Sequence, residues 1–265
     1  MNLTTVDIYK DLWTIRQNSP LVHNITNYVV MNSTANALLA IGASPVMAHA
    51  EQEVADMVDI ASALVINIGT LSREWIDAMF KAAKKARQKG IPIILDPVGA
   101  GATPFRTDTA RDLIRSAAPA VIRGNGSEIM ALSQAGGTTK GVDSTSESGQ
   151  AVESARNLNL AFDSVVCVTG ETDYILSDSG VLEVKNGHYL MPRVTGMGCT
   201  ASALCGAFAA VNPDFRQAAA HAMAVMGIAG EIAAKEAKGP GTLQLHFLDA
   251  LFLMSEQDIH DHLTV

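Results

Sequence analysis

The chain has 265 residues, of which 48% are hydrophobic, 17% are charged and 5% are aromatic, and its formal net charge is −8. This length can bury a sizeable core, and no repeat or linker interrupts it, so we predict a single domain over residues 1–265. The negative charge argues against nucleic acid and membrane surfaces as partners, so a bound phosphate would need backbone amides and a few placed cations.

Three cysteines, Cys167, Cys199 and Cys205, are too few for a disulfide framework. The first residues show no basic and apolar signal segment, and no apolar run is long enough to span a bilayer. We therefore expect a cytoplasmic protein.

Short apolar runs alternate with longer amphipathic runs from the N-terminus onward. We predict a helix over residues 28–39, and the small residues of the segment 42–47 lead into a predicted apolar strand. Further strands are expected at residues 63–67, 91–95, 120–123 and 165–168, and further helices at residues 74–89, 104–117 and 127–135. The alternation predicts an α/β fold in which helices cover both faces of a mostly parallel sheet.

Punctuating residues mark several of the element ends. Ser72 is a typical N-cap and Gly90 a typical stop for the helix at 74–89. The basic residues near the end of that helix are better explained as a solvated face that complements the helix dipole than as a binding patch. A hairpin is expected over 173–185, a surface loop over 136–149, and a mostly helical C-terminal third.

Polar or glycine-rich segments follow the expected strands, and ligands bind beyond the carboxyl ends of strands in open parallel sheets. The segments are Gly69-Thr70, Asp96-Pro97-Val98-Gly99, Arg123-Gly124-Asn125 and Thr169-Gly170. Because parallel strands point the same way, these segments should meet at one edge of the sheet.

Two carboxylates are candidate metal ligands at this edge. Asp96 ends one strand, and Glu128 lies in the first turn of the helix that follows the next strand. Carboxylates at adjacent strand ends can hold Mg²⁺, usually with water molecules. For Glu128 the alternative is a capping role at the helix N-terminus.

Arg123 and Thr169 are candidate phosphate contacts, because a guanidinium fork and a hydroxyl at strand ends suit that ligand. The alternatives are a surface ion pair for Arg123 and an ordinary strand-to-loop transition for Thr169.

The stretch from Gly196 to Cys199 is the most informative of the chain. A glycine-punctuated turn, with Gly196 and Gly198, runs directly into an apolar helix of small residues. The first N–H groups of such a helix lack intrahelical partners and can bind an anion, although a plain capped helix is the alternative. Cys199 lies where a transfer reaction would need a proton acceptor, and a helix N-terminus lowers the pKa of a thiol.

The segment from Leu21 to Asn27 places two asparagines and a histidine before a helix. They are either helix caps or the lining of a polar pocket, and we take Asn27 as a candidate substrate contact. Met47 is either core filler or a soft wall against an aromatic ligand.

Six stretches in this order resemble the hydroxyethylthiazole kinases, a family of the ribokinase-like superfamily. They are Leu21-Val-His-Asn-Ile-Thr-Asn27, Gly42-Ala-Ser-Pro-Val-Met47, Leu95-Asp-Pro-Val-Gly99, Ile122-Arg-Gly-Asn-Gly-Ser-Glu-Ile-Met130, Val168-Thr-Gly-Glu-Thr-Asp-Tyr174 and Gly196-Met-Gly-Cys199. The resemblance covers essentially the whole chain. It implies a ribokinase-like three-layer sandwich and transfer of a phosphoryl group from ATP to the hydroxyl of 5-(2-hydroxyethyl)-4-methylthiazole in thiamine salvage.

The resemblance also implies roles for single residues. Met47 and Gly196 match thiazole-contacting positions, Arg123 and Thr169 match ATP-contacting positions, and Asp96 and Glu128 match positions associated with Mg²⁺. Cys199 takes the place where most ribokinase-like kinases have an aspartate base, and the family is typically a homotrimer with active sites between subunits. Met197 departs from the usual threonine of the glycine turn, which removes a hydroxyl but keeps the backbone N–H.

Three other functions are weighed against this one. A related kinase for hydroxymethylpyrimidine or a pyridoxal-type alcohol should carry aspartate in place of Cys199. A regulatory protein that only binds nucleotide should have lost Asp96, Glu128 or the glycine turn, and all are present. An ATP-dependent dehydratase of the same fold would release phosphate together with ADP.

Overall fold

A computed structural model describes residues 3–133 and 147–265, and its centre is one eight-stranded sheet. The strands are β1 (Leu21–Ile25), β2 (Ser44–Val46), β3 (Ala63–Asn67), β4 (Ile93–Asp96), β5 (Val121–Asn125), β6 (Val165–Thr169), β7 (Asp173–Ser177) and β8 (Gly180–Val184). Their order in the sheet is β2-β1-β3-β4-β5-β6-β7-β8. β1 to β6 run parallel, and β7 and β8 form the antiparallel hairpin that the sequence predicts.

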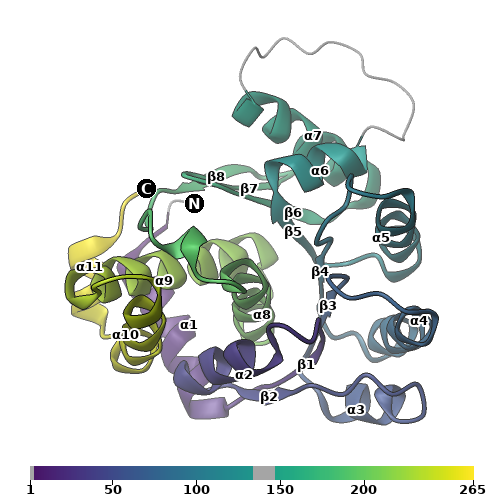
Figure 1. Cartoon of the computed structure of the whole chain (residues 1–265), viewed down its shortest axis with the longest axis horizontal. Coiled ribbons are helices and arrows are strands. Elements are labelled where there is room, and N and C mark those ends of the chain that lie inside the picture. Colours follow the sequence, from purple (N-terminus) through teal and green to yellow (C-terminus); the bar gives the residue numbers. More distant parts are fainter. Residues whose placement is uncertain (1–2, 134–146) are drawn as a thin grey trace.

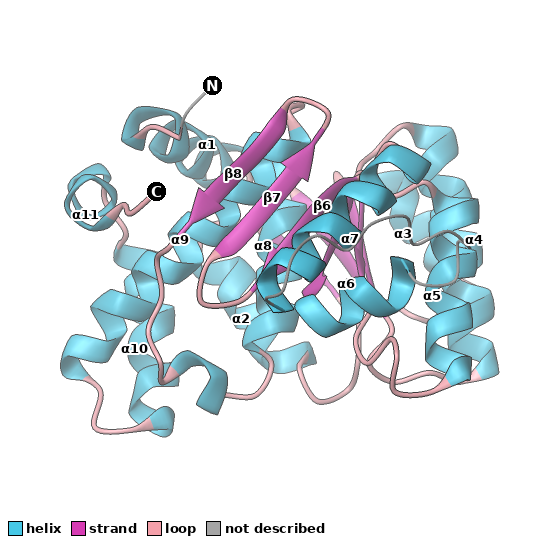
Figure 2. Ribbon diagram, turned by 90° about the horizontal axis from the view of Figure 1, so that it is seen from above, coloured by secondary structure: helices cyan, strands magenta, loops and turns pink. Residues whose placement is uncertain are grey.

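Helices cover both faces of this sheet, as predicted (Figures 1 and 2). The helices are α1 (Thr5–Asn18), α2 (Met31–Ala40), α3 (Val54–Ile60), α4 (Arg73–Lys89), α5 (Pro104–Ala117), α6 (Gly126–Ser133), α7 (Glu147–Phe162), α8 (Met197–Ala209), α9 (Phe215–Glu236), α10 (Pro240–Leu253) and α11 (Glu256–His262), with a short 3-10 helix, η2 (Met191–Arg193). The helices α3 to α7 lie on one side of the sheet, and α1, α2 and α8 to α11 lie on the other (Figure 1). No helix in the described ranges has the length and apolar character needed to cross a membrane.

The two faces of the sheet bury separate apolar clusters because successive strand side chains point to opposite faces. On β3, Leu64 and Ile66 face the α3–α7 layer, whereas Val65 faces the α8 layer. The helix α8 packs closely on that second face through Gly206, where an added Cβ would lie 2.6 Å from Cγ2 of Val65. This close approach brings the N-terminus of α8 toward the carboxyl edge of the sheet.

Local capping explains the boundaries that the sequence predicts best. The Ser72 hydroxyl accepts a hydrogen bond from the Trp75 N–H at the start of α4, and Gly90 ends the helix in the left-handed conformation with φ 77°. At the start of α5, Thr103 caps the helix ahead of Pro104. The predicted helix at 104–117 and the strand at 63–67 are therefore confirmed at their observed bounds.

Most basic side chains near the end of α4 bind backbone carbonyls or a carboxylate of neighbouring segments. The Lys89 ammonium contacts the carbonyls of Val58, Asp59 and Ala61 at the end of α3, and Lys85 pairs with Asp59 at 2.8 Å. Cations at the end of α3 complement its dipole, so these side chains hold two helices together.

Three expectations about the elements are wrong. Residues 21–25 form strand β1 rather than a polar lead into a helix, and the helix predicted from residue 28 begins at Met31. Residues 147–149 belong to α7 rather than to the predicted loop, whose remaining residues lie outside the described ranges. The strand β1 escapes prediction because its polar residues are buried. Nε2 of His23 donates a hydrogen bond to the Ala48 carbonyl at 2.7 Å.

Candidate active site

The carboxyl ends of β3, β4 and β5 place three polar side chains on one face of the sheet. Asn67 is the register partner of Asp96, and the pairing of Leu95 with Ile122 puts Arg123 next along from Asp96. Alternation along each strand puts all three side chains on the face that α8 covers. All three residues are buried.

Asp96 is held by donors from two directions. Its Oδ2 accepts a hydrogen bond from Nδ2 of Asn67 at 2.7 Å and another from Oγ of Ser202, on α8, at 2.8 Å. Its Oδ1 is buried and has no hydrogen-bond partner among the described residues. Burial raises the pKa of Asp96 to about 6, although the positive charge of Arg123 acts in the opposite direction.

Glu128 makes the capping contacts that were one of its two predicted roles. Its Oε2 accepts a hydrogen bond from the Asn125 N–H at 2.9 Å, while the Glu128 N–H donates to Oδ1 of Asn125 at 2.9 Å. This reciprocal pair resembles a capping box. The other carboxylate oxygen accepts from the Gly99 N–H at 2.9 Å, which ties the loop after β4 to the start of α6.

These carboxylates suit a cation as part of a larger ligand set. The buried Oδ1 of Asp96 is free for such a contact, and Asp96 and Glu128 repel each other enough for Glu128 to raise the pKa of Asp96. The described ranges contain no cluster of three or more His, Cys, Asp or Glu residues placed to hold a metal by themselves. An ion here would therefore need further oxygen ligands from water or a bound phosphate.

Arg123 is a buried cation rather than a surface ion pair. It takes part in no ion pair within the described residues, and its Nη2 donates a hydrogen bond to Oγ1 of Thr169 at 2.6 Å. Its Nε is buried without a partner among the described residues. The predicted phosphate candidates Arg123 and Thr169 thus lie together at the ends of β5 and β6.

The glycine turn opens α8 as predicted. Gly196 has a φ of 86°, which favours glycine, and no side chain caps the helix. A Cβ at Gly196 would lie 2.8 Å from Cγ1 of Val30, and a Cβ at Gly198 would lie 2.9 Å from Nη1 of Arg123. The turn therefore extends from the start of α2 to the guanidinium at the end of β5.

Cys199 lies in the first turn of α8, partly buried beside Asp96. Its Sγ accepts hydrogen bonds from Nδ2 of Asn67 at 3.2 Å and from Nδ2 of Asn27 at 3.4 Å. Burial, followed by the charge of Asp96, raises the pKa of this thiol to about 11. The sequence predicts a lowered pKa at the helix N-terminus, but the pKa of this thiol is raised. Desolvation is the largest effect and outweighs the hydrogen bonds and the positive charge that favour the thiolate.

The two remaining candidates lie at the β1 and β2 end of the same edge. Asn27 is buried, and its amide donates to Oδ1 of Asn67 at 3.0 Å as well as to Cys199. Met47 follows β2, is partly exposed and belongs to neither apolar cluster, so it is not core filler. Met197 is partly buried and packs against the core cluster beneath α8.

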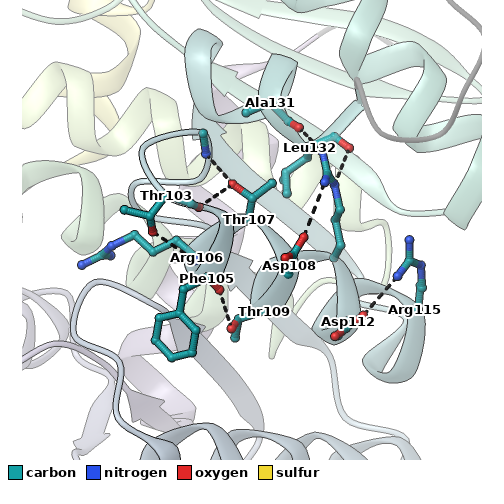
Figure 3. A network of polar contacts seen from close by, with 12 residues as sticks. Thr103, Phe105, Arg106, Thr107, Asp108, Thr109, Asp112, Arg115, Ala131 and Leu132 are labelled. Carbon is teal, nitrogen blue, oxygen red and sulfur yellow. Dashed lines mark hydrogen bonds and ion pairs between the residues drawn. The ribbon is translucent and has the colours of Figure 1, made fainter.

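Sequence reasoning missed three residues that organise this site: Asn67, Ser202 and Arg106. The guanidinium of Arg106 donates to the Ile68 and Val98 carbonyls at 2.9 Å and to the Gly69 carbonyl at 3.0 Å. Figure 3 shows this side chain leaving α5 on the side opposite Ala131 and Leu132, which bind Arg111. Only Asn67 had a usable signal, since it is a polar residue at the end of an apolar strand.

A sequence model of the Hydroxyethylthiazole kinase family matches residues 12–257. The chain belongs to this family. A hydroxyethylthiazole kinase of Syntrophus aciditrophicus is 60% identical over 266 residues, which cover 100% of this chain and 98% of the relative. The solved structure of the hydroxyethylthiazole kinase from Pyrococcus horikoshii OT3 superposes with a TM-score of 0.91 at 44% identity, covering 98% of both chains.

More distant structures extend the likeness of fold. A pyridoxal kinase of Bacillus subtilis, solved as an ADP complex, gives a TM-score of 0.62 at 17% identity over 80% of this chain and 91% of that one. The predicted ribokinase-like three-layer α/β sandwich is confirmed for this hydroxyethylthiazole kinase family member.

Proposed function

We propose that this chain transfers a phosphoryl group from ATP to the hydroxyl of 5-(2-hydroxyethyl)-4-methylthiazole, a reaction of thiamine salvage. Family membership and the match to curated hydroxyethylthiazole kinases support this activity. The observation that carries it in the structure is the path of the turn from Gly196 to Cys199. A Cβ added at Gly196 would meet Val30 and one at Gly198 would meet Arg123, while the charge of Asp96 acts on the Cys199 thiol of the same turn.

The order of the strands supports this proposal, because the candidate residues follow strands that are ordered from the proposed thiazole end to the proposed ATP end of one sheet edge. Asn27 and Met47 follow β1 and β2, at the proposed thiazole end, together with Gly196. Arg123 and Thr169 end β5 and β6, at the proposed ATP end. The strands β3 and β4 lie between these ends, so the hydroxyl and the terminal phosphate would meet over Asp96 and α8.

The start of α8 is the proposed anion site for the migrating phosphoryl group. The N–H groups of Met197, Gly198 and Cys199 open the helix, where intrahelical partners are lacking. Stabilising charge on the transferred oxygens is the main demand of phosphoryl transfer, and fixed amides do so without reorganising. Since Met197 keeps its backbone N–H, the absence of the usual threonine hydroxyl leaves this anion site intact.

Asp96 and Glu128 are the residues that would hold Mg²⁺, together with ATP phosphates. For Asp96, this assignment is supported by its buried Oδ1, which has no hydrogen-bond partner within the described ranges. Bound there, the ion would neutralise phosphate charge. A cation also favours the ionised carboxylate, which opposes the upward pKa shift that burial causes at Asp96.

Cys199 is the proposed group nearest the substrate hydroxyl. A thiol with a pKa of about 11 is mostly protonated near neutrality, so it orients the alcohol more than it removes its proton. This fits a loose transition state, in which the alcohol keeps its proton until late and general-base help contributes modestly.

We also propose a homotrimer with active sites between subunits, on the family resemblance, and a cytoplasmic location. The three free cysteines fit a reducing compartment. The residues of the site come from both halves of the chain around one sheet, which fits a single kinase domain over the chain.

A coupled assay of ADP release tests the activity. Purified protein is supplied with ATP, Mg²⁺ and, in separate reactions, the thiazole alcohol, hydroxymethylpyrimidine, pyridoxal or no acceptor. ADP release that depends on the thiazole alcohol, with a phosphorylated product, is expected. Stronger turnover of another alcohol, or free phosphate in place of a phosphorylated product, would contradict the proposal.

A further inference from the structure

The side-chain amide of Asn67 uses both of its ends in the site. Its Nδ2 donates to Oδ2 of Asp96 at 2.7 Å and to Sγ of Cys199 at 3.2 Å. Its Oδ1 accepts from the Gly69 N–H at 2.9 Å and from Nδ2 of Asn27 at 3.0 Å. With four bonds, this amide joins the ends of β1, β3 and β4 to the start of α8.

The orientation of this amide follows from its partners. A backbone N–H can only donate, so the atom facing Gly69 must be the oxygen of Asn67. The nitrogen must then face Asp96 and Cys199, and the sulfur is an acceptor for this bond. The geometry excludes the flipped amide, in which two donors would meet at Gly69.

Asn27 adds a second donor to the same sulfur at 3.4 Å. A sulfur that accepts from two amides cannot direct its own S–H toward either of them. Asp96, the carboxylate that acts on this thiol, already accepts at Oδ2 from Asn67 and Ser202. Its Oδ1 has no hydrogen-bond partner among the described residues, so the thiol does not donate to that oxygen either. The S–H therefore points out of this cluster.

We propose that Asn67 is a positioning residue for phosphoryl transfer, whose amide holds the Cys199 sulfur as an acceptor and keeps its S–H from bonding to Asp96. The expected effect on turnover rests on the proposed kinase function, whereas the hydrogen bonds do not depend on that function. Asn27 supports the same arrangement by holding Oδ1 of Asn67 and touching the sulfur.

The two asparagines also oppose the effects that keep the thiol protonated. Burial and the charge of Asp96 raise the pKa of Cys199, whereas the amides of Asn67 and Asn27 and the charge of Arg123 lower it. Asp96 and Arg123 are the charged groups that act on this thiol, from β4 and β5. Without Asn67, the sulfur loses its nearer donor, and Asp96 becomes available to accept from the S–H.

The test compares Asn67→Ala with Ser202→Ala. Both variants remove one donor from Oδ2 of Asp96, but Ser202→Ala leaves both sulfur donors in place. The rate of Cys199 alkylation by iodoacetamide is measured on the whole chain without ATP, with peptide mass spectrometry to locate the label. Cys167 and Cys205 are fully buried and serve as internal references for the folded state.

We expect Asn67→Ala to react roughly tenfold more slowly than Ser202→Ala at about pH 9. Loss of a hydrogen bond to the charged thiolate raises the pKa of Cys199 by about one unit, which lowers the thiolate fraction about tenfold. A decrease smaller than about fivefold, or a faster reaction, would overturn the proposal. If Asn67→Ala does not fold, Asn27→Ala takes its place, and its rate must again fall below that of Ser202→Ala.

A double-mutant cycle measured by kcat separates a positioning role of Asn67 from a purely structural role. Asn67→Ala should lower kcat in the presence of Cys199 and should have at least about fivefold less effect in a Cys199→Ala background, since residues that act as a unit are non-additive. Equal losses in both backgrounds would overturn the role in catalysis. Absence of kinase activity in the unsubstituted chain would instead overturn the proposed function, and the alkylation result would stand by itself.

Discussion

The hydroxyl of Ser202 donates to the Asp96 carboxylate at 2.8 Å, and this bond connects α8 to the end of β4. It crosses from the helix that would hold the transferred phosphate to the strand that would hold its counterion. Asp96 is 1% exposed, so the contact is shielded from water. The carboxylate is thus kept in an environment that disfavours its charge.

Asp96→Asn should stabilise the fold while abolishing turnover. The folded-state pKa of Asp96 is raised from 3.8 to about 6, so the native chain binds more protons than the unfolded chain between these values. The free energy of unfolding therefore falls as pH rises through this window, by about 3 kcal/mol at 1.4 kcal/mol per unit, and stays low above it. Urea unfolding at about pH 8 should show a gain of roughly 1–3 kcal/mol for Asp96→Asn. A less stable variant at that pH would contradict this account.

The pH dependence of kcat/KM should show an acidic limb from the same group. The proposed role of Asp96 in holding Mg²⁺ requires its ionised form, so activity should rise as pH increases through about 6 in the free enzyme. Burial also raises the pKa of Asp173 to about 6, so Asp173→Asn is the matched control. Its limb should keep the same midpoint. If the acidic limb disappears in Asp173→Asn, the limb reports the titration of Asp173 and not that of Asp96.

Cys199→Asp should keep or increase turnover. A carboxylate accepts hydrogen bonds from Asn27 and Asn67 as the sulfur does, and it is the usual group at this place in ribokinase-like kinases. Cys199→Ala should lower kcat by roughly 10- to 100-fold, which is the size of a modest acid–base contribution. Steady-state kcat values for both variants test this prediction. A folded but inactive Cys199→Asp protein would argue against a position beside the reacting hydroxyl.

Arg106 should matter for stability and for the loops that carry the site. Arg106→Ala removes three bonds to the carbonyls of Ile68, Val98 and Gly69 and should cost about 2–4 kcal/mol of unfolding free energy. Arg115→Ala, on the same helix, loses only an exposed pair with Asp112 and should change stability by less than about 0.5 kcal/mol. Both side chains are drawn in Figure 3, and denaturant unfolding measures the stability of the two variants. Equal losses would show that the loop contacts contribute no stability.

Much of this architecture could be predicted from local signals. The Ser72 and Gly90 caps bound α4, and the polar residues after the apolar strands locate the site edge. Local patterns could not reveal β1, because the buried His23 and Asn24 break its apolar run.

The contacts that organise the site depend on packing between distant elements. Ser202 meets Asp96 across 106 positions of sequence, and Arg106 reaches the loops after β3 and β4 from a helix that gives no local sign of it. The pKa of Cys199 was expected to fall because the helix dipole is readable in sequence, whereas the burial that reverses it is not. The candidate residues were therefore predictable, but their electrostatics were not.

The most direct test of the account is turnover and ATP binding in Gly198→Val. The new side chain would meet Nη1 of Arg123, which lies 2.9 Å from the Cβ position, and would fill the space above the first amides of α8. Gly241→Ala is the control, because nothing lies within 4 Å of its Cβ position. We predict that Gly198→Val folds with an unchanged far-ultraviolet spectrum but loses thiazole-dependent ADP release, while Gly241→Ala retains it. Undiminished turnover in folded Gly198→Val would contradict the proposal that this turn holds the phosphoryl group.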